Sequence, residues 1–219
     1  MFKRNPSAWP RWIERQLVRR GITDHRVLQV FSNVPREDFV RPQFRDLTLN
    51  DAPIPLGCRQ TVSQPYIIAL SLQGLELTGS ERVLEVGTGS GFQAVLLSHL
   101  AKAVFTVEIH DKLYVAAHLP LERLQKAPVY ARLGDGSTGW KEHAPYDAIV
   151  VGCRAPKLPQ PLADQLAVGG RMVIPLGGDS VQALYQIRKL ADGSLKKKIL
   201  ERVMFVPLLG KEGTGRKTR

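Results

Sequence analysis

The stretch Arg82-Val-Leu-Glu-Val-Gly-Thr-Gly-Ser-Gly91 decides the fold of this chain. Its first half is a short apolar run of the kind that a buried parallel strand needs. Its second half places three glycines before residues 92–101, where apolar side chains recur at helical spacing. Glycine allows positive φ and lets a ligand approach the backbone, and the first turn of a helix offers unpaired N–H groups to an anion. We therefore predict a strand, a ligand-binding turn and a helix.

A second predicted strand, 103–107, ends in Glu108. A carboxylate about 20 residues beyond a glycine turn is placed to hold a ribose hydroxyl. The glycines are spaced G-x-G-x-G, with Glu85 two positions before the first, whereas a dinucleotide site has G-x-G-x-x-G. This pattern resembles motif I of the class I S-adenosylmethionine-dependent methyltransferases. We expect a nucleotide-type cofactor here, in preference to a glycine turn without a ligand.

Length and composition limit the possible classes of protein. A chain of 219 residues can form one α/β domain with a modest extension. It has no apolar run of about 18 residues, which a membrane-spanning helix would need. The basic N-terminus lacks the apolar stretch of a secretory signal. Cys58 and Cys153 form neither a metal-binding pattern nor a disulfide framework, so we expect a cytoplasmic enzyme.

The formal charge of +11 is concentrated at the two ends of the chain. Residues 1–45 carry ten Lys or Arg and four Asp or Glu, and residues 188–219 carry ten and three. The intervening residues 46–187 carry eleven and thirteen, so the middle is close to neutral. Basic ends can attract RNA, acidic proteins or a membrane surface, although a solvated surface is an equally good interpretation.

The remaining pattern divides the chain into three parts. Residues 1–50 form a helical N-terminal annex, in which Thr23 or Asp24 caps the second helix. Residues 51–209 form the core, which begins with an irregular, proline-rich crossing at 51–57 and continues as alternating strands and helices. The further strands are predicted at 129–133, 147–151, 171–175, 183–187 and 199–206. Residues 210–219 are expected to be a basic disordered tail. The fold class is thus α/β, a doubly wound, mostly parallel, seven-stranded Rossmann-like sheet.

Polar residues gather at the open end of this sheet, where ligands bind in such folds. The glycine turn, Glu108, Asp135 and residues 152–156 all follow strand ends. Asp135 either accepts a hydrogen bond from an adenine amino group or only stabilises its own turn. The sequence shows no Cys/His pair, nucleophile elbow or metal-ligand cluster, which argues against those chemistries.

Five segments occur in the order found in protein-L-isoaspartate O-methyltransferases. They are Pro35-Arg-Glu-Asp-Phe-Val40, Thr61-Val-Ser-Gln-Pro-Tyr66, residues 84–93, Gly134-Asp-Gly136 and Phe205-Val-Pro-Leu208. The chain resembles this family over nearly its whole length, and the Thr61–Tyr66 segment is more specific than the glycine turn. The resemblance implies methyl transfer from S-adenosylmethionine to the carboxylate of L-isoaspartyl (D-aspartyl) residues in damaged proteins. The ester then closes to a succinimide, which initiates repair.

The resemblance also implies a site. Ser63 lies at the reaction centre; its hydroxyl can aim a carboxylate that is already ionised at neutral pH, so no strong base is required. If Ser63 or Thr61 instead caps the following helix, its role is structural. Cofactor contacts are expected from Thr61, Glu85, Gly87, Thr88, Gly89, Ser90, Gly91, Glu108, Asp135 and Gly136. Substrate contacts are expected from Ser63, Gln64, Arg154, Val206 and Pro207. No metal is expected.

The sequence departs from the family after the fourth core strand, where it reads Gly152-Cys-Arg154. Arg154 could pair with the substrate carboxylate through both guanidinium nitrogens, narrow the pocket, or mark a changed substrate. Two alternatives therefore remain beside isoaspartyl methylation. One is a methyltransferase of the same build that acts on RNA or a specialised peptide, and the other is a non-catalytic S-adenosylmethionine-binding protein. We expect a monomer that binds nucleic acid only weakly and has no membrane contact.

Overall fold

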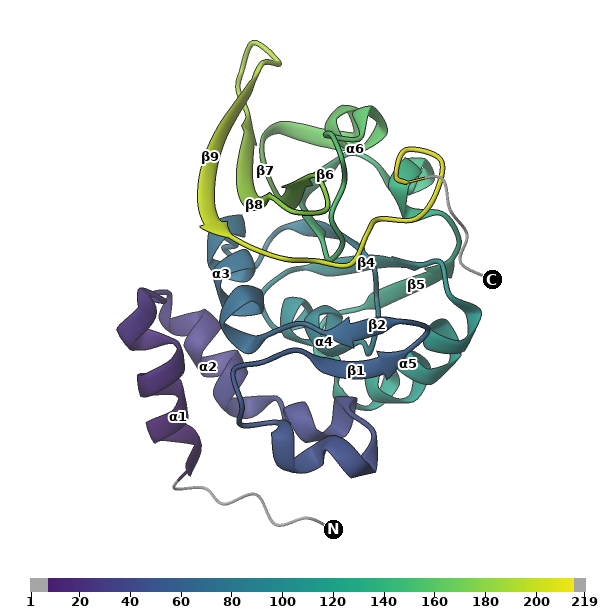
Figure 1. The fold of residues 1–219 in the computed structure, drawn as a ribbon. Coiled ribbons are helices and arrows are strands. Elements are labelled where there is room, and N and C mark those ends of the chain that lie inside the picture. The colour runs from purple at the N-terminus through teal and green to yellow at the C-terminus, as the bar shows by residue number, and fades with distance from the viewer. Residues whose placement is uncertain (1–7, 215–219) are drawn as a thin grey trace.

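Strand β3 (Arg82–Val86) is an inner strand of the sheet in a computed structural model that describes residues 8–214 (Figure 1). It pairs in parallel with β4 (Ala103–Glu108) on one side and with β6 (Tyr146–Val151) on the other. All its residues after Arg82 are buried, which explains the apolar run in the sequence. The described residues form a main sheet of seven strands in the order β5-β4-β3-β6-β7-β8-β9.

The outer strands complete a mostly parallel sheet. β5 (Val129–Leu133) and β7 (Leu166–Gly177) run parallel to their inner neighbours, whereas β8 (Gln182–Lys189) and β9 (Leu195–Arg202) are antiparallel. The chain moves outward from β3 through β4 to β5 and then resumes at β6 on the other side. This reversal places a ligand crevice at the carboxyl ends of the central strands. The predicted doubly wound, seven-stranded α/β fold is confirmed.

Alternate residues of the strands face two apolar layers. Val83, Val104 and Val150 belong to the larger core cluster, whereas Leu84 and Phe105 belong to the smaller one. The helices flanking the sheet are α3 (Pro65–Leu75), α4 (Phe92–Ser98), α5 (Asp111–Leu124) and α6 (Gln160–Gln165). The first three contribute to the larger cluster and α6 to the smaller, so both faces of the sheet are covered.

The N-terminal annex is helical, and its helix α2 packs against both α1 and α3 (Figure 1). Its elements are α1 (Ala8–Gln16), α2 (His25–Asn33) and 3-10 turns at Val18–Arg20, Arg36–Phe39 and Pro42–Leu47. Asp24 caps α2 by accepting a hydrogen bond from the Arg26 amide at 2.9 Å. Leu17 and Phe31 are buried in the larger core cluster, so the annex shares its core with the sheet. Residues 1–7 of the expected annex lie outside the described residues.

The segment expected to be irregular at 51–57 contains the first strand of a hairpin. β1 (Ile54–Gly57) pairs antiparallel with β2 (Gln60–Val62) around a two-residue turn. Cys58 and Arg59 both have positive φ, 51° and 57°. Such turns usually carry Asn or Gly, so no hairpin is predicted from these residues, and the expectation of an irregular crossing is corrected.

The C-terminal end also differs from expectation. β9 ends at Arg202 rather than near residue 206, and residues 203–214, here called the C-terminal segment, leave the sheet and cross its open end (Figure 1). β9 begins at Leu195, earlier than expected. Its three consecutive exposed lysines, 196–198, lack the alternating apolar pattern that predicts a strand, although lysine is common on edge strands. Residues 210–214 form a hydrogen-bonded turn, so the disordered tail cannot begin at residue 210, and residues 215–219 lie outside the described residues. No helix among residues 8–214 has the length and apolarity to cross a bilayer.

Candidate active site

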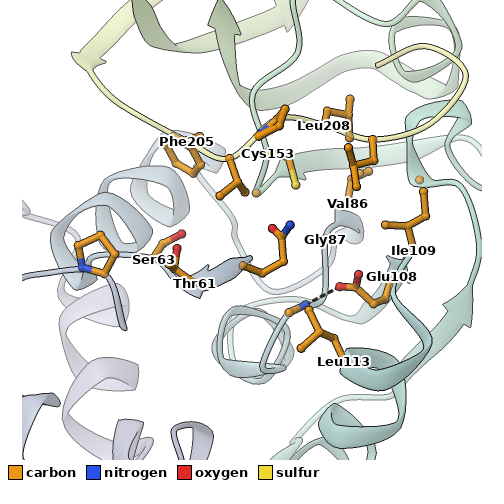
Figure 2. A pocket seen from close by; sticks show the side chains of 18 of the residues that line it. Thr61, Ser63, Val86, Gly87, Glu108, Ile109, Leu113, Cys153, Phe205 and Leu208 are labelled. Atoms are coloured by element: carbon orange, nitrogen blue, oxygen red, sulfur yellow. Dashed lines mark hydrogen bonds between the residues drawn. The ribbon is translucent and has the colours of Figure 1, made fainter. Parts of the chain in front are cut away.

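A cavity of about 750 Å³ opens at the carboxyl ends of β3, β4 and β6 (Figure 2). Figure 2 shows Thr61 and Ser63 on one side of it and Glu108 and Leu113 on the other. Its lining comes from four parts of the chain and includes Gln60, Thr61, Ser63 and Gln64 before α3, Gly87 and Gly89 in the glycine turn, Glu108, Ile109, His110 and Leu113 around the β4–α5 turn, and Arg202–Leu209. Gly136 also lines it. The cavity thus joins segments that are far apart in the sequence.

Gly87, Gly89 and Gly91 all have positive φ, but a side chain at each would meet different surroundings. A Cβ at Gly87 would lie 3.2 Å from the Cys153 sulfur, and one at Gly91 would lie 3.3 Å from Leu121. These two glycines allow the chain to pack on itself. Gly89, with φ +57°, has only Leu56 near its Cβ direction, at 3.5 Å, and lines the cavity. Gly89 is therefore the position at which a ligand can approach the backbone.

Glu108 connects the glycine turn to the start of α5. Its Oε2 accepts a hydrogen bond from the Gly89 amide at 2.8 Å, and its Oε1 accepts one from the His110 amide at 2.9 Å. The side chain is buried yet lines the cavity. Each carboxylate oxygen retains a further lone pair for a ligand hydroxyl. The predicted meeting of Glu108 with the glycine turn is therefore present.

Glu85 lies behind the turn rather than in the cavity lining. Its Oε2 accepts a hydrogen bond from the Thr106 hydroxyl at 2.6 Å, and the Thr88 hydroxyl lies 2.6 Å from that of Thr106. Complete burial raises the pKa of Glu85 to about 8, and the nearby charge of Glu108 adds to this. Glu85 is therefore largely protonated at neutral pH. Glu85, Thr88, Ser90 and Gly91, all expected to contact the cofactor, do not line this cavity.

Ser63 lines the cavity just before α3. The N-cap of α3 is Gln64, whose side chain makes no capping hydrogen bond. The carboxylate of Asp51 takes that place: it accepts hydrogen bonds from the Tyr66 amide at 3.0 Å and from the Gln64 side-chain amide at 2.6 Å. The Ser63 hydroxyl has no hydrogen-bond partner within residues 8–214, so it is available to a ligand.

The backbone at Ser63 is held by a buried arginine. The guanidinium of Arg36 donates hydrogen bonds to the carbonyls of Thr48, Asn50, Ala52 and Ser63, at 2.9 to 3.2 Å. Burial lowers the pKa of Arg36 to about 10, and Asp51 opposes this shift, so the guanidinium stays charged at neutral pH. The annex therefore fixes the position of the residue expected at the reaction centre.

Comparison with known proteins identifies the family. The family profile for protein-L-isoaspartate(D-aspartate) O-methyltransferase matches residues 12–213. The chain belongs to this family. A Trichlorobacter lovleyi protein named protein-L-isoaspartate O-methyltransferase is 47% identical over 206 residues, covering 94% of this chain and 95% of the relative. One from Geobacter metallireducens is 46% identical over 208 residues, with coverages of 95% and 96%.

A solved structure agrees with this membership. It is a Plasmodium falciparum structure described as a protein-L-isoaspartate O-methyltransferase in complex with S-adenosyl-L-homocysteine. Its TM-score is 0.79 at 26% identity, over 94% of this chain and 99% of that one. The resemblance carried by the five sequence segments is therefore confirmed, as is the class I methyltransferase fold.

In this member of the isoaspartyl methyltransferase family, Asp135 faces its own turn. Its Oδ1 accepts hydrogen bonds from the amide and hydroxyl of Ser137 at 2.9 and 2.6 Å, and its Oδ2 accepts one from the Lys211 amide at 2.8 Å. Gly136 lines the cavity but Asp135 does not. Of the two interpretations left open by the sequence, the structure displays the turn-stabilising one.

The side chain of Arg154, like that of Asp135, makes its contacts outside the cavity lining. Its buried guanidinium pairs with Asp179 and donates to the Gly177 carbonyl at 3.3 Å. The side chain is not part of the cavity lining, so the expected pairing with a substrate carboxylate has no support in this arrangement. The main chain of Arg154 instead pairs with the C-terminal segment, donating to Val206 at 2.8 Å and accepting from Leu208 at 2.7 Å. Val206 and Pro207 therefore lie in the lining, as does Gln64.

Several lining residues were missed by sequence reasoning. Ile109, Leu113, Leu208 and Leu209 are apolar, and such residues look like core in a sequence. Ile109 could have been found as the neighbour of Glu108. Cys153 also lines the cavity, and burial raises the pKa of its thiol to about 12, with further contributions from Glu108 and Glu85. The thiol is thus neutral and has little nucleophilic character.

Proposed function

We propose that this chain transfers a methyl group from S-adenosylmethionine to the carboxylate of L-isoaspartyl (D-aspartyl) residues in damaged proteins. The observation that carries the proposal is the arrangement of one cavity, with Glu108 and the glycine turn on one side and the free hydroxyl of Ser63 on the other (Figure 2). The methyl ester then closes to a succinimide, which starts the repair of the residue. Family membership supports this reaction.

The residues on the Glu108 side suit the cofactor. Gly89 leaves its backbone open to an amino-acid group, Glu108 has acceptor capacity for ribose hydroxyls, and Ile109, Leu113 and Leu208 offer apolar surface to a base. We assign Thr61, Gly87 and Gly136 to the same site. Glu85 and Thr88 support the turn from behind through Thr106. Within the turn, the Ser90 hydroxyl accepts a hydrogen bond from the Phe92 amide at 3.3 Å, and Gly91 allows close packing against Leu121. When bound, S-adenosylmethionine supplies an electrophilic methyl group on a sulfonium.

The residues on the Ser63 side suit the acceptor. An isoaspartyl carboxylate is ionised at neutral pH, so the protein has to orient it and exclude water rather than remove a proton. The Ser63 hydroxyl donates to one carboxylate oxygen and directs the other toward the methyl donor. Gln64, Val206 and Pro207 border the entering peptide. Arg154, bonded to Asp179, has no direct part in this scheme.

The experiment offers labelled S-adenosylmethionine together with two peptides that differ only in Asp or isoaspartate at one position. Base-labile methyl incorporation into the isoaspartyl peptide alone is expected. Equal labelling of both peptides, or of neither, would reject the proposal.

Measurements of RNA binding at several salt concentrations address the alternative of an RNA or specialised-peptide acceptor. That alternative is motivated by the basic ends, with net charges of +6 over residues 1–45 and +7 over 188–219. We propose that any binding of nucleic acid is weak and nonspecific, so that its logarithmic affinity falls linearly with the logarithm of salt concentration. A tight, sequence-selective RNA complex would favour the alternative.

The location and assembly of the protein are also proposals. Cys58 and Cys153, the two cysteines of the sequence, are free thiols, which suits a reducing cytoplasm. We propose that the protein acts as a monomer, because one chain supplies both sides of the cavity. Sedimentation at micromolar concentration tests this.

A further inference from the structure

The C-terminal segment forms one wall of the active-site cavity although it lies outside the sheet. After β9 it crosses the open end of the strands, and residues 203–209 all line the cavity (Figures 1 and 2). Its middle is held by the main chain of Arg154, and the Phe205 amide donates to the Gln182 side chain at 2.7 Å. The position of this wall therefore depends on the contacts that the C-terminal segment makes along its own length.

The far end of the segment is fastened to the turn after β5. The amide of Lys211 donates to Oδ2 of Asp135 at 2.8 Å, and the amide of Glu212 donates to the hydroxyl of Ser137 at 3.0 Å. Ser137 is completely buried and donates in turn to Oδ1 of Asp135 at 2.6 Å. The Thr214 amide then closes the turn by donating to the Leu208 carbonyl at 2.9 Å.

Gly210 makes this fastening possible. Its φ is +120°, and a Cβ built there would lie only 2.0 Å from Oδ1 of Asp135. The chain therefore passes directly over the carboxylate, at a distance that no side chain allows. The close passage aligns the next amide, that of Lys211, with the other carboxylate oxygen.

We infer that Asp135 and Ser137 are positioning residues, which latch the C-terminal segment so that Leu208 and Leu209 stay in place in the wall of the cavity. This inference rests on the proposed function, because it assigns that wall to the cofactor. Asp135 acts on the cofactor through the segment, and loss of the latch speeds cofactor release. The basic side chain of Lys211 has no part in the latch, since only its backbone amide is used.

The decisive variant is Lys211→Pro, which removes the amide that donates to Asp135 without altering the carboxylate. Its matched control is Lys211→Ala, which removes the charge and keeps the amide. A second pair is Gly210→Ala, which forces the segment off Asp135, and Gly193→Ala. Gly193 also has positive φ, +81°, but it lies in the β8–β9 turn with no atom near its Cβ direction.

Two measurements are made on each folded variant. Stopped-flow displacement gives the dissociation rate of S-adenosylhomocysteine, and amide hydrogen exchange reports the opening of residues 205–214 without any ligand. We expect Lys211→Pro and Gly210→Ala to release the ligand roughly tenfold faster, because about one hydrogen bond is lost, and to exchange faster. The KM for peptide should stay near the wild-type value, and both controls should match the wild type.

The measurements distinguish a latch at Asp135 from direct contact between Asp135 and the cofactor. If both latch variants keep the wild-type dissociation rate while Asp135→Asn weakens binding, Asp135 contacts the cofactor directly and the inference is wrong. If exchange of the segment is unchanged in both latch variants, the latch does not hold it, and the inference is equally wrong. If the wild-type protein itself binds no S-adenosylhomocysteine, the proposed function fails, and the exchange data still report on the latch.

Discussion

The guanidinium of Arg36 donates a hydrogen bond to the main-chain carbonyl of Ser63 across 3.2 Å. The same group holds three carbonyls of residues 48–52, so it joins the annex to the acceptor side of the cavity. Its side chain is completely buried. The annex thus has a function in the active site beyond covering α3, since it sets the position of Ser63.

Replacing Arg36 with lysine should therefore affect stability and acceptor alignment together. Lysine keeps the charge but lacks the planar fork that reaches several carbonyls. We expect the free energy of unfolding to fall by about 2 kcal/mol, because at least two carbonyls lose their donor. Turnover of isoaspartyl peptide should fall roughly 10- to 100-fold through misplacement of Ser63. Urea unfolding and steady-state kinetics measure the two effects.

Arg132→Lys provides the control for the Arg36 variant. Arg132 also donates to a carbonyl, that of Gly139 at 2.7 Å, but it does not line the cavity. The Arg132→Lys variant should have a lower free energy of unfolding, while its folded fraction keeps the wild-type turnover. If Arg36→Lys retains both wild-type turnover and wild-type KM for peptide, Arg36 does not position Ser63.

Ser63→Ala separates catalysis from helix capping. Because Asp51, not Ser63, accepts the hydrogen bond at the start of α3, the free energy of unfolding should change by less than about 0.5 kcal/mol. The methylation rate should fall roughly 10- to 1,000-fold, as for loss of one oriented donor. Ser63→Thr keeps the donor and should recover part of the rate. Single-turnover kinetics beside thermal unfolding test this, and wild-type rates in Ser63→Ala would remove Ser63 from the catalytic scheme.

Gly89→Val should abolish binding of S-adenosylmethionine. The side chain would enter the cavity, and its β-branch disfavours the positive φ of this position. Gly79→Val is the matched control, because Gly79 also has positive φ and no atom near its Cβ direction, and it lies outside the cavity lining. Calorimetric titration of both folded variants should show loss of affinity only in the first. Unchanged affinity at Gly89 would make the turn purely structural.

The sequence was sufficient where local pattern determines structure. The apolar run of β3, the glycines after it and Glu108 at the end of β4 are all local signals, and the sheet topology brings them together. The β1–β2 hairpin was missed because Cys58 and Arg59 are unusual residues for their turn. The role of the C-terminal segment was missed for a different reason. Its contact between Lys211 and Asp135 joins residues far apart in the sequence, and no periodicity reports such a contact.

The buried carboxyl group of Glu85 should give the protein a characteristic dependence of stability on pH. Its pKa rises from the ordinary value of 4.5 to about 8 in the folded state, chiefly because burial penalises the charged form. Between these two values the folded protein holds a proton that the unfolded chain has released. The free energy of unfolding should therefore carry a contribution that is complete below about pH 4.5 and is lost as pH rises toward 8.

Glu85→Gln removes this titration while keeping a neutral side chain of similar shape. Relative to the wild type, its free energy of unfolding should therefore increase between pH 5 and pH 8.5, as measured by urea unfolding at several pH values. Glu81→Gln is the control, because the pKa of Glu81 is shifted in the opposite direction to that of Glu85. Burial raises the pKa of Glu81, but hydrogen bonds from Thr78 and Gly79 outweigh this and lower it, so its contribution is lost only in acid. Parallel curves for Glu85→Gln and the wild type over this range would mean that Glu85 is ionised in the folded protein.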